Sequence, residues 1–220
     1  MIETAQIVGA SGRVGSALAA RLTERGVAVR EAGAELVLLT VPDTAIAEVA
    51  RGIEPGPWVA HTSGATSLAA LDPHVRRFGL HPLQTFTHQR GSEQLDGAHA
   101  AVVSESPEAR HVGWWLAQLL GLEPFDLEED ARPLYHAGAA IASNYLVTLH
   151  RVASELFEAA GAPSAGLAPL MRRTIDNGFE LTGPISRGDW ATVERHRVAI
   201  RGSRPELEAL YDVLADATTP

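Results

Sequence analysis

The chain has 220 residues, a net charge of −9 and a composition that is 45% apolar. It is long enough for one large domain or two small ones, and apolar enough to bury a core. All 18 of its basic residues are Arg, and a chain this acidic lacks the basic surface that nucleic acid or an anionic membrane requires. Because the chain contains no Cys, disulfide bridges and thiolate metal sites are excluded.

The N-terminal residues lack the cationic segment and the apolar run that are typical of a signal peptide. The sequence contains no run of about 18 apolar residues, so no membrane span is predicted. We therefore expect a cytoplasmic protein whose partner is a small molecule, with no nucleic acid or membrane contacts.

A glycine-rich turn near the N-terminus is the first functional signal. Residues 5–9 (AQIVG) predict a buried strand, and SALAARLTERG predicts a helix that ends at Gly26. Between them, Gly9, Gly12 and Gly15 have the spacing GxxGxxG, which in this context is typical of a phosphate-binding turn. The free N–H groups and the dipole at the helix N-terminus would bind a diphosphate. The alternative is a tight turn that binds no ligand.

Other residues around this turn are candidates for cofactor binding. Ser11 and Val14 lie within it, and Arg13 at its rim has a guanidinium suited to the 2′-phosphate of NADP. About 20 residues after the turn, the usual fold places a residue that reads the ribose of the cofactor. In this zone Arg30 favours NADP, whereas the adjacent Glu31 favours NAD.

The next segment is shorter than the usual fold requires. Only EAGA (31–34) separates VAVR (27–30) from the buried strand ELVLLTV (35–41). If 27–30 and 35–41 were full strands on opposite sides of the first strand, the chain between them would have to run back about 17 Å and step sideways about 10 Å. Four residues reach only about 17 Å when fully extended, so this arrangement does not fit. We therefore predict that 27–30 is not a full parallel strand and that 35–41 lies beside the first strand. The usual third strand and the helix before it would be absent, which leaves the adenosine pocket open.

Strand and helix signals alternate up to about residue 128 and predict an α/β fold with a parallel sheet. Beyond the strands already described, strands are expected at 57–61, within 78–87, at 99–106 and at 122–127, with a helix at 107–121. Ligands of such sheets bind at the carboxyl ends of the strands. Three turns should therefore converge there, at Thr40–Asp43, His61–Gly64 and His81–Gln84.

After residue 128 the strand signals stop, and apolar residues recur at helical spacing. Helices are predicted at 130–161, 164–183, 188–200 and 204–217. The change in pattern predicts two domains, 1–128 and 129–220.

Six motifs, taken in order, resemble those of one family. They are GxxGRVGxxLA, LLTVPD, HTSGA, HPLQTF, LYHAGAAIASNYLVTL and TGPISRGDWATVERH. The chain resembles a two-domain, Rossmann-like NADP oxidoreductase family with a C-terminal helical domain of unknown function. That family is similar to ketopantoate reductase, pyrroline-5-carboxylate reductase and the β-hydroxyacid dehydrogenases. The resemblance covers nearly the whole chain, although the sequence departs from the family pattern at 27–41. It implies a homodimer formed through the helical substrate domain.

The resemblance also implies a nicotinamide cofactor, NADP with NAD as the alternative. In Rossmann oxidoreductases the TVPD turn lies against the nicotinamide side of the cofactor. Thr40, Val41 and Pro42 are therefore candidate cofactor contacts, and Ser63 in the next turn is another.

Reduction of a carbonyl requires a proton donor as well as a hydride. The related enzymes commonly take a Lys and an Asn from one face of the first helix of the second domain. Here that face carries His136, Ala140 and Asn144, spaced i, i+4 and i+8. Because the chain has no Lys, His136 is the predicted acid and Asn144 the predicted orienting group. Helix packing is the structural alternative for both.

His81, which precedes Pro82 at a predicted strand end, is the second candidate for the acid. Gln84 is a candidate substrate contact, and Arg187 in TGPISRGD is the best available clamp for a substrate carboxylate. The structural alternatives are a loop braced by His81 and an ion pair at Arg187. The remaining His residues have no metal-ligand spacing, so no metal site is expected.

The leading hypothesis is an NADP-dependent reductase of a small 2-keto acid, similar to ketopantoate reductase. A second is a non-catalytic relative that acts as a binding or sensing dimer, since the short 27–41 region removes part of the cofactor site. A third is a reductase of cyclic imines on the same fold.

Overall fold

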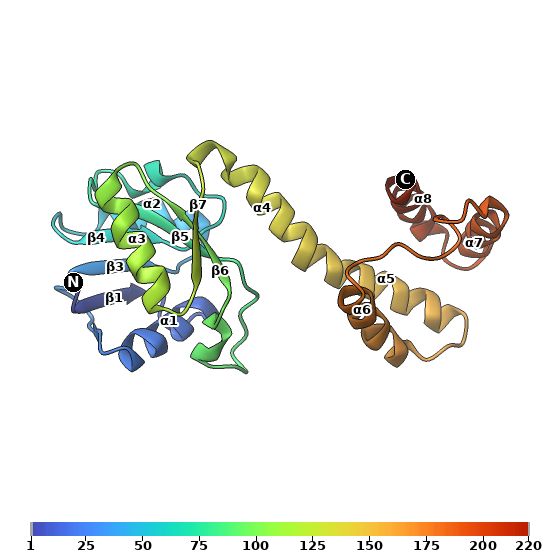
Figure 1. Ribbon diagram of the computed structural model, residues 1–220, viewed down its shortest axis with the longest axis horizontal. Coiled ribbons are helices and arrows are strands. Elements are labelled where there is room, and N and C mark those ends of the chain that lie inside the picture. Colours follow the sequence, from blue (N-terminus) through green and yellow to red (C-terminus); the bar gives the residue numbers. More distant parts are fainter. Residues whose placement is uncertain (1, 220) are drawn as a thin grey trace. The chain divides into compact units, whose positions relative to one another are not determined.

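The computed structural model describes residues 2–219, which form two compact units with the division between Ala140 and Ile141. The first unit contains a seven-stranded sheet in the order β2-β1-β3-β4-β5-β6-β7 (Figure 1). All neighbours are parallel except β5 and β6, which confirms the predicted α/β class. The strands are β1 (Thr4–Val8), β2 (Ala28–Val29), β3 (Leu36–Leu39), β4 (Trp58–His61), β5 (Arg77–Pro82), β6 (His99–Val103) and β7 (Glu123–Asp126).

Helices connect these strands, and one further helix follows the last strand. They are α1 (Arg13–Glu24), α2 (Ile46–Arg51), α3 (Pro107–Leu119) and α4 (Arg132–Ala140), with short 3-10 turns η1 (Asp43–Ala45), η2 (Leu68–Leu71), η3 (Ser92–Leu95) and η4 (Glu129–Ala131). The strands end near residue 128, where the sequence pattern placed a domain boundary, but α4 still belongs to the first unit.

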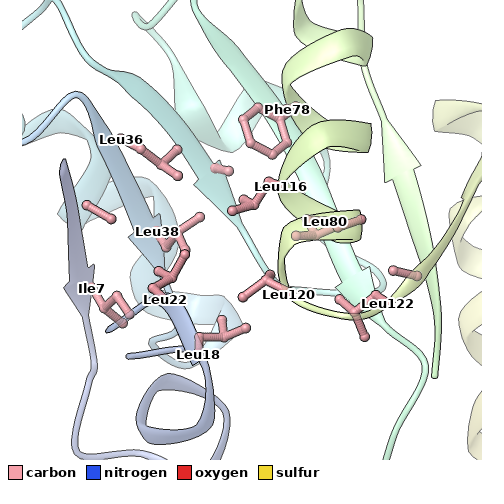
Figure 2. Packing of buried hydrophobic residues seen from close by; sticks show 14 of the residues in the cluster. Ile7, Leu18, Leu22, Leu36, Leu38, Phe78, Leu80, Leu116, Leu120 and Leu122 are labelled. Carbon is pink, nitrogen blue, oxygen red and sulfur yellow. The ribbon is translucent and has the colours of Figure 1, made fainter. Parts of the chain in front are cut away.

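The core of the first unit has two layers, one on each face of the sheet. All four residues of β3 are buried, as expected for a parallel strand that is covered on both faces. Leu36 and Leu38 pack in one layer with Leu22 of α1 and Leu116 of α3 (Figure 2). The alternate residues of β3 pack in the other layer with α2 and η2. Each fully buried leucine side chain stabilises the folded state by about 1.5–3 kcal/mol, so the leucines of β3 contribute strongly to the stability of the core.

The short segment after α1 is built largely as its length predicts. β2 pairs with only the first part of β1, Thr4 opposite Ala28 and Ala5 opposite Val29. β3 begins its pairing on the other side of Ala5, opposite Leu36. Because the chain leaves β2 and enters β3 at the level of the same residue, the connection steps sideways without a return along the strand. Within residues 2–219 no strand lies outside β2, which confirms that the usual third strand is absent.

The second unit is helical. It contains a π-helical turn η5 (Ile141–Tyr145), α5 (Leu146–Ala159), η6 (Ser164–Gly166), α6 (Leu167–Asp176), α7 (Trp190–Ser203), η7 (Pro205–Leu207) and α8 (Glu208–Thr218). The single helix predicted at 130–161 is therefore interrupted by a stretch of i→i+5 hydrogen bonding. Asp189 caps α7 by accepting a hydrogen bond from the Thr192 N–H at 3.1 Å. No helix among residues 2–219 combines the length and apolarity that a membrane crossing requires.

Candidate active site

The glycine-rich turn joins β1 to α1 and is packed too tightly for a side chain at Gly9 or Gly15. Gly9 has a φ of +96°, in the left-handed region, and a Cβ there would lie 2.7 Å from the Thr40 hydroxyl oxygen. A Cβ at Gly15 would overlap the Gly9 carbonyl oxygen. The turn is closed by a 2.9 Å hydrogen bond from the Gly12 N–H to that carbonyl.

The N-terminus of α1 opens from this turn. The helix begins at Arg13, and its N-cap, Gly12, has no side chain with which to satisfy the first N–H groups. Those groups and the helix dipole favour an anion. The closely packed glycines and the uncapped helix end therefore fit a diphosphate, and the predicted contacts Ser11 and Arg13 are exposed beside them.

The turns after β3 and β4 form the neighbouring wall. The Thr40 N–H and hydroxyl both donate to the Val8 carbonyl, at 2.9 and 3.0 Å, so β3 ends level with β1. Ser63 Oγ donates to Asp43 Oδ2 at 2.8 Å and accepts from the Thr66 N–H at 2.9 Å. Ser63, a predicted cofactor contact, is thus buried and ties the two turns together.

Two histidines and a tyrosine meet beside Gly64. His81 Nδ1 lies 2.8 Å from the Tyr135 hydroxyl, and the rings of His81 and His136 are 5.9 Å apart at an interplanar angle of 78°. A Cβ at Gly64 would lie 2.5 Å from His136 Cδ2 and 2.9 Å from His81 Nε2. The structure therefore brings the two predicted acids together and adds Tyr135, which the sequence analysis did not select.

The protonation of His81 and Tyr135 follows from their burial. Burial, with His136 and Arg132 nearby, lowers the pKa of His81 to about 4. Burial also raises the pKa of Tyr135 to about 12. At neutral pH the His81 ring is neutral and the phenol is protonated. We assign the phenol as the donor to Nδ1, which leaves the ring proton on Nε2, the nitrogen that faces Gly64.

A buried cation braces the loop behind this cluster. Arg132 at the start of α4 is 2% exposed, and its Nη2 donates to the Ser63 carbonyl at 2.6 Å. Its Nη1 lies 3.6 Å from Glu129 Oε2. His61 is fully buried, and burial together with the charge of Arg132 lowers its pKa to about 4. Sequence reasoning missed Arg132 because a basic residue at a helix start has the pattern of a solvated one.

Of two other predicted contacts in the first unit, Arg30 is anchored by its backbone below the glycine turn and Gln84 bonds within its own loop. The Arg30 N–H donates to the Ala5 carbonyl at 2.8 Å, part-way along β1 and below the glycine turn. Gln84 Nε2 donates to the Gln94 carbonyl at 3.1 Å, and its Oε1 accepts from the Thr85 N–H at 2.8 Å. Gln84 therefore braces its own loop.

The remaining predicted contacts fall into two groups. Val14 lies in the first turn of α1, and Val41 and Pro42 follow Thr40 directly. Asn144 and Arg187 belong to the second unit, Asn144 in the π-helical turn and Arg187 in an exposed loop before α7. The roles of these residues stay predictions.

Comparison with known families identifies the chain. A model described as a Rossmann-like domain matches residues 25–86, and one described as a domain of unknown function (DUF2520) matches residues 99–218, more than half of the chain. The chain belongs to the DUF2520 family. This confirms the resemblance to a two-domain family with a Rossmann-like domain and a C-terminal helical region of unknown function. A comparison with curated proteins finds no match.

Solved structures share the fold of this DUF2520 protein along nearly its whole length. A Bacteroides fragilis protein described as an NADP oxidoreductase is 22% identical, with a TM-score of 0.81 and coverage of 99% of this chain and 98% of that one. A Thermotoga maritima protein is 23% identical, with a TM-score of 0.77 and coverage of 98% and 96%. A semialdehyde dehydrogenase NAD-binding protein from Cupriavidus necator, solved with calcium and NAD, is 18% identical, with a TM-score of 0.65 and coverage of 96% and 99%.

Proposed function

We propose that this protein is a nicotinamide-dependent oxidoreductase that reduces a small 2-keto acid, with NADPH, or NADH as the alternative, as the donor. The observation that carries the proposal is that one unit contains both an uncapped glycine turn and a half-buried cluster of His81, Tyr135 and His136. The descriptions of the structural neighbours support a nicotinamide cofactor, because one is called an NADP oxidoreductase and another was solved with NAD.

The proposed roles follow from the geometry of the first unit. The turn from Gly9 to Gly15 binds the diphosphate through backbone N–H groups, and Thr40 fixes the wall beside it. A bound reduced nicotinamide supplies the hydride. His81 Nε2–H donates a hydrogen bond to the substrate carbonyl; as the oxygen gains negative charge it takes the Nε2 proton while the Tyr135 phenol passes its proton to Nδ1, so the imidazole stays neutral and solvent later reprotonates the phenolate. Tyr135 holds the tautomer that makes this donation possible.

Two roles are assigned to the second unit. We propose that Asn144 orients the substrate and that Arg187 binds its carboxylate, since a guanidinium matches a carboxylate with two parallel hydrogen bonds. We also propose a homodimer formed through the second unit, because many large apolar side chains there are exposed in the single chain. They are Ile141, Tyr145, Leu146, Val147, Leu149, Leu170, Ile175, Phe179, Leu181, Trp190, Val198, Val213 and Leu214.

The proposal is tested by following cofactor oxidation with a panel of 2-keto acids and cyclic imines. We expect turnover of at least one 2-keto acid, and a fall in kcat/KM of about 100-fold or more in His81→Asn, the range for loss of a general acid. His88→Asn is the matched control, because His88 is exposed in another loop. Tyr135→Phe should lower kcat while leaving KM nearly unchanged, since Tyr135 acts through His81.

Other outcomes would favour the competing functions. Turnover of imines alone would identify a cyclic-imine reductase. If neither NADH nor NADPH binds at millimolar concentration, the reductase proposal fails and a non-catalytic binding or sensing dimer is favoured, as the short β2 suggests. Turnover that is unchanged in His81→Asn would contradict the role of this residue but not the reaction.

A further inference from the structure

The two strands that flank β1 end at different distances from the glycine turn. On the β3 side, pairing runs to Leu39 opposite Val8, and the Thr40 N–H donates to the Val8 carbonyl directly before the turn. On the β2 side, the last backbone–backbone hydrogen bond is from the Arg30 N–H to the Ala5 carbonyl at 2.8 Å. Ala5 lies three residues before the end of β1, so β2 stops about 10 Å short of the turn, given a strand rise of roughly 3.3 Å per residue.

Side chains of β1 and of the connection fix this short ending in place. Gln6 Nε2 donates to the Glu31 carbonyl at 2.6 Å, directly after β2. Glu35 Oε2, directly before β3, accepts from the Glu3 and Thr4 N–H groups at 2.7 and 3.1 Å. The connection is therefore held across β1 at the lower level by specific hydrogen bonds.

This asymmetry separates the two halves of a dinucleotide site. In the usual fold, a residue about 20 positions after the turn, at the end of the second strand, reads the adenosine 2′ position. By count that residue is Arg30 or Glu31, but the Arg30 backbone is bonded beside Ala5 instead of beside Gly9, and the Glu31 carbonyl accepts from Gln6 Nε2. The nicotinamide side of the turn is complete, whereas the adenosine side has no strand end to line it.

We infer that this site binds the nicotinamide ribosyl-diphosphate part of the cofactor and leaves the adenosine 2′ position unread. The inference rests on the proposed function and sharpens it: NADH and NADPH should bind with similar affinity. Arg13 is exposed on the first turn of α1, and its side chain has no hydrogen bond or ion pair to another described residue. It contacts the diphosphate, which both cofactors share, and therefore does not discriminate between them.

The test measures binding, by NADH and NADPH fluorescence and by calorimetry, so it does not depend on turnover. A charge-assisted hydrogen bond to a 2′-phosphate changes affinity by about tenfold or more, which sets the threshold. We expect the two dissociation constants to agree within about tenfold. Adenosine 2′,5′-bisphosphate, which copies the adenosine end of NADPH, should not displace either cofactor, whereas nicotinamide mononucleotide should displace both.

Three single substitutions test which arginine side chains contact the cofactor. Arg30→Ala should leave the ratio of the two dissociation constants unchanged, and Arg13→Ala should weaken both cofactors by a similar factor. Arg25→Ala, an exposed arginine at the far end of α1, is the matched control. All three replaced side chains are exposed, so folding should be retained.

The opposing results are equally distinct. A preference beyond about tenfold for either cofactor, displacement by the bisphosphate, or a selective loss of NADPH binding in Arg30→Ala or Arg13→Ala would overturn the inference and leave the proposed function intact. Failure of both cofactors to bind at millimolar concentration would overturn both.

Discussion

Burial decides the charge of individual side chains at this site. His61 is fully buried, and in the described part of the chain neither of its ring nitrogens has a hydrogen-bond partner. Burial and the positive charge of Arg132 therefore oppose protonation, and the pKa of His61 falls from 6.5 to about 4. The folded protein holds a neutral ring at neutral pH, whereas the unfolded chain binds a proton near pH 6.5.

We predict that His61→Gln reduces the acid sensitivity of the first unit. Between pH 6.5 and pH 4 the unfolded state binds more protons at His61 than the folded state does, so the stabilisation is complete above pH 6.5 and is lost as the pH falls. A pKa lowered by this amount corresponds to a loss on the order of 3 kcal/mol in the free energy of unfolding as the pH falls. Urea unfolding followed by Trp fluorescence measures it, because three of the four Trp residues (Trp58, Trp114 and Trp115) lie in the first unit and Trp190→Phe removes the signal of the second.

The quantity to compare is the slope of the free energy of unfolding against pH. Its absolute value is not compared, since the substitution itself can destabilise the core. His61→Gln should retain part of the dependence, because burial lowers the pKa of His81 in the same direction. His88→Gln, at an exposed position, should retain all of it. A wild-type slope in His61→Gln would show that this ring does not titrate as proposed.

The sequence predicts some of these residues and not others, for a physical reason. His81 is predicted because it ends a strand with a local pattern, and His136 because the family resemblance implies catalytic residues on one face of that helix. Tyr135 has no such signal, since its hydroxyl reaches His81, 54 residues earlier in the chain. Arg132 is likewise recognised only when its contact with Ser63, 69 residues away, is known. Contacts over such separations depend on how β4, β5 and α4 pack.

At the scale of elements, the turn between β1 and α1 depends on close backbone packing. A Cβ at Gly15 would overlap the Gly9 carbonyl oxygen and lie 2.6 Å from Thr40 Oγ1. We predict that Gly15→Ala lowers the free energy of unfolding by about 1–3 kcal/mol, the usual cost of overpacking. The displaced turn should also bind NADH and NADPH at least about tenfold more weakly.

Gly138→Ala in α4 is the matched control, because nothing lies within 4 Å of a Cβ at that position. Alanine in place of glycine favours a helix by about 1 kcal/mol, so this variant should be at least as stable as the wild type. Thermal unfolding and cofactor titration of the two variants separate a local clash from a general effect of added methyl groups. Normal cofactor affinity in Gly15→Ala would contradict the role of the turn.

Element-level prediction succeeded where chain length sets a limit. Four residues between two strand signals were too few for a full crossover, and β2 is indeed two residues long beside β1. The reach argument assumed a return along the strand, and the structure avoids that return by ending β2 level with Ala5. The π-helical turn at Ile141–Tyr145 was not predicted, because apolar residues at helical spacing do not distinguish i→i+4 from i→i+5 hydrogen bonding.

At the scale of the whole molecule, the two units differ in how much core they contain. The first unit buries leucines on both faces of its sheet. In the described part of the second unit, the buried apolar residues are Leu167, Val193, Ile200 and Ala215. So small a core leaves large apolar surface exposed, and exposed apolar patches of this kind are typical of an interface between subunits. This supports the proposed homodimer on physical grounds, independently of the family resemblance.

We therefore predict that the wild-type chain is a dimer at micromolar concentration and that a charge on this surface dissociates it. Val147 and Val213 are 70% and 65% exposed in the single chain, and Glu at either position would be costly to bury. Each substitution should raise the dimer dissociation constant by at least about tenfold, measured by light scattering and sedimentation. Val75→Glu, at a 92% exposed position in the first unit, should leave the dimer intact. A monomeric wild type, or a dimer that tolerates Glu at both second-unit positions, would place the subunit contact elsewhere or remove it.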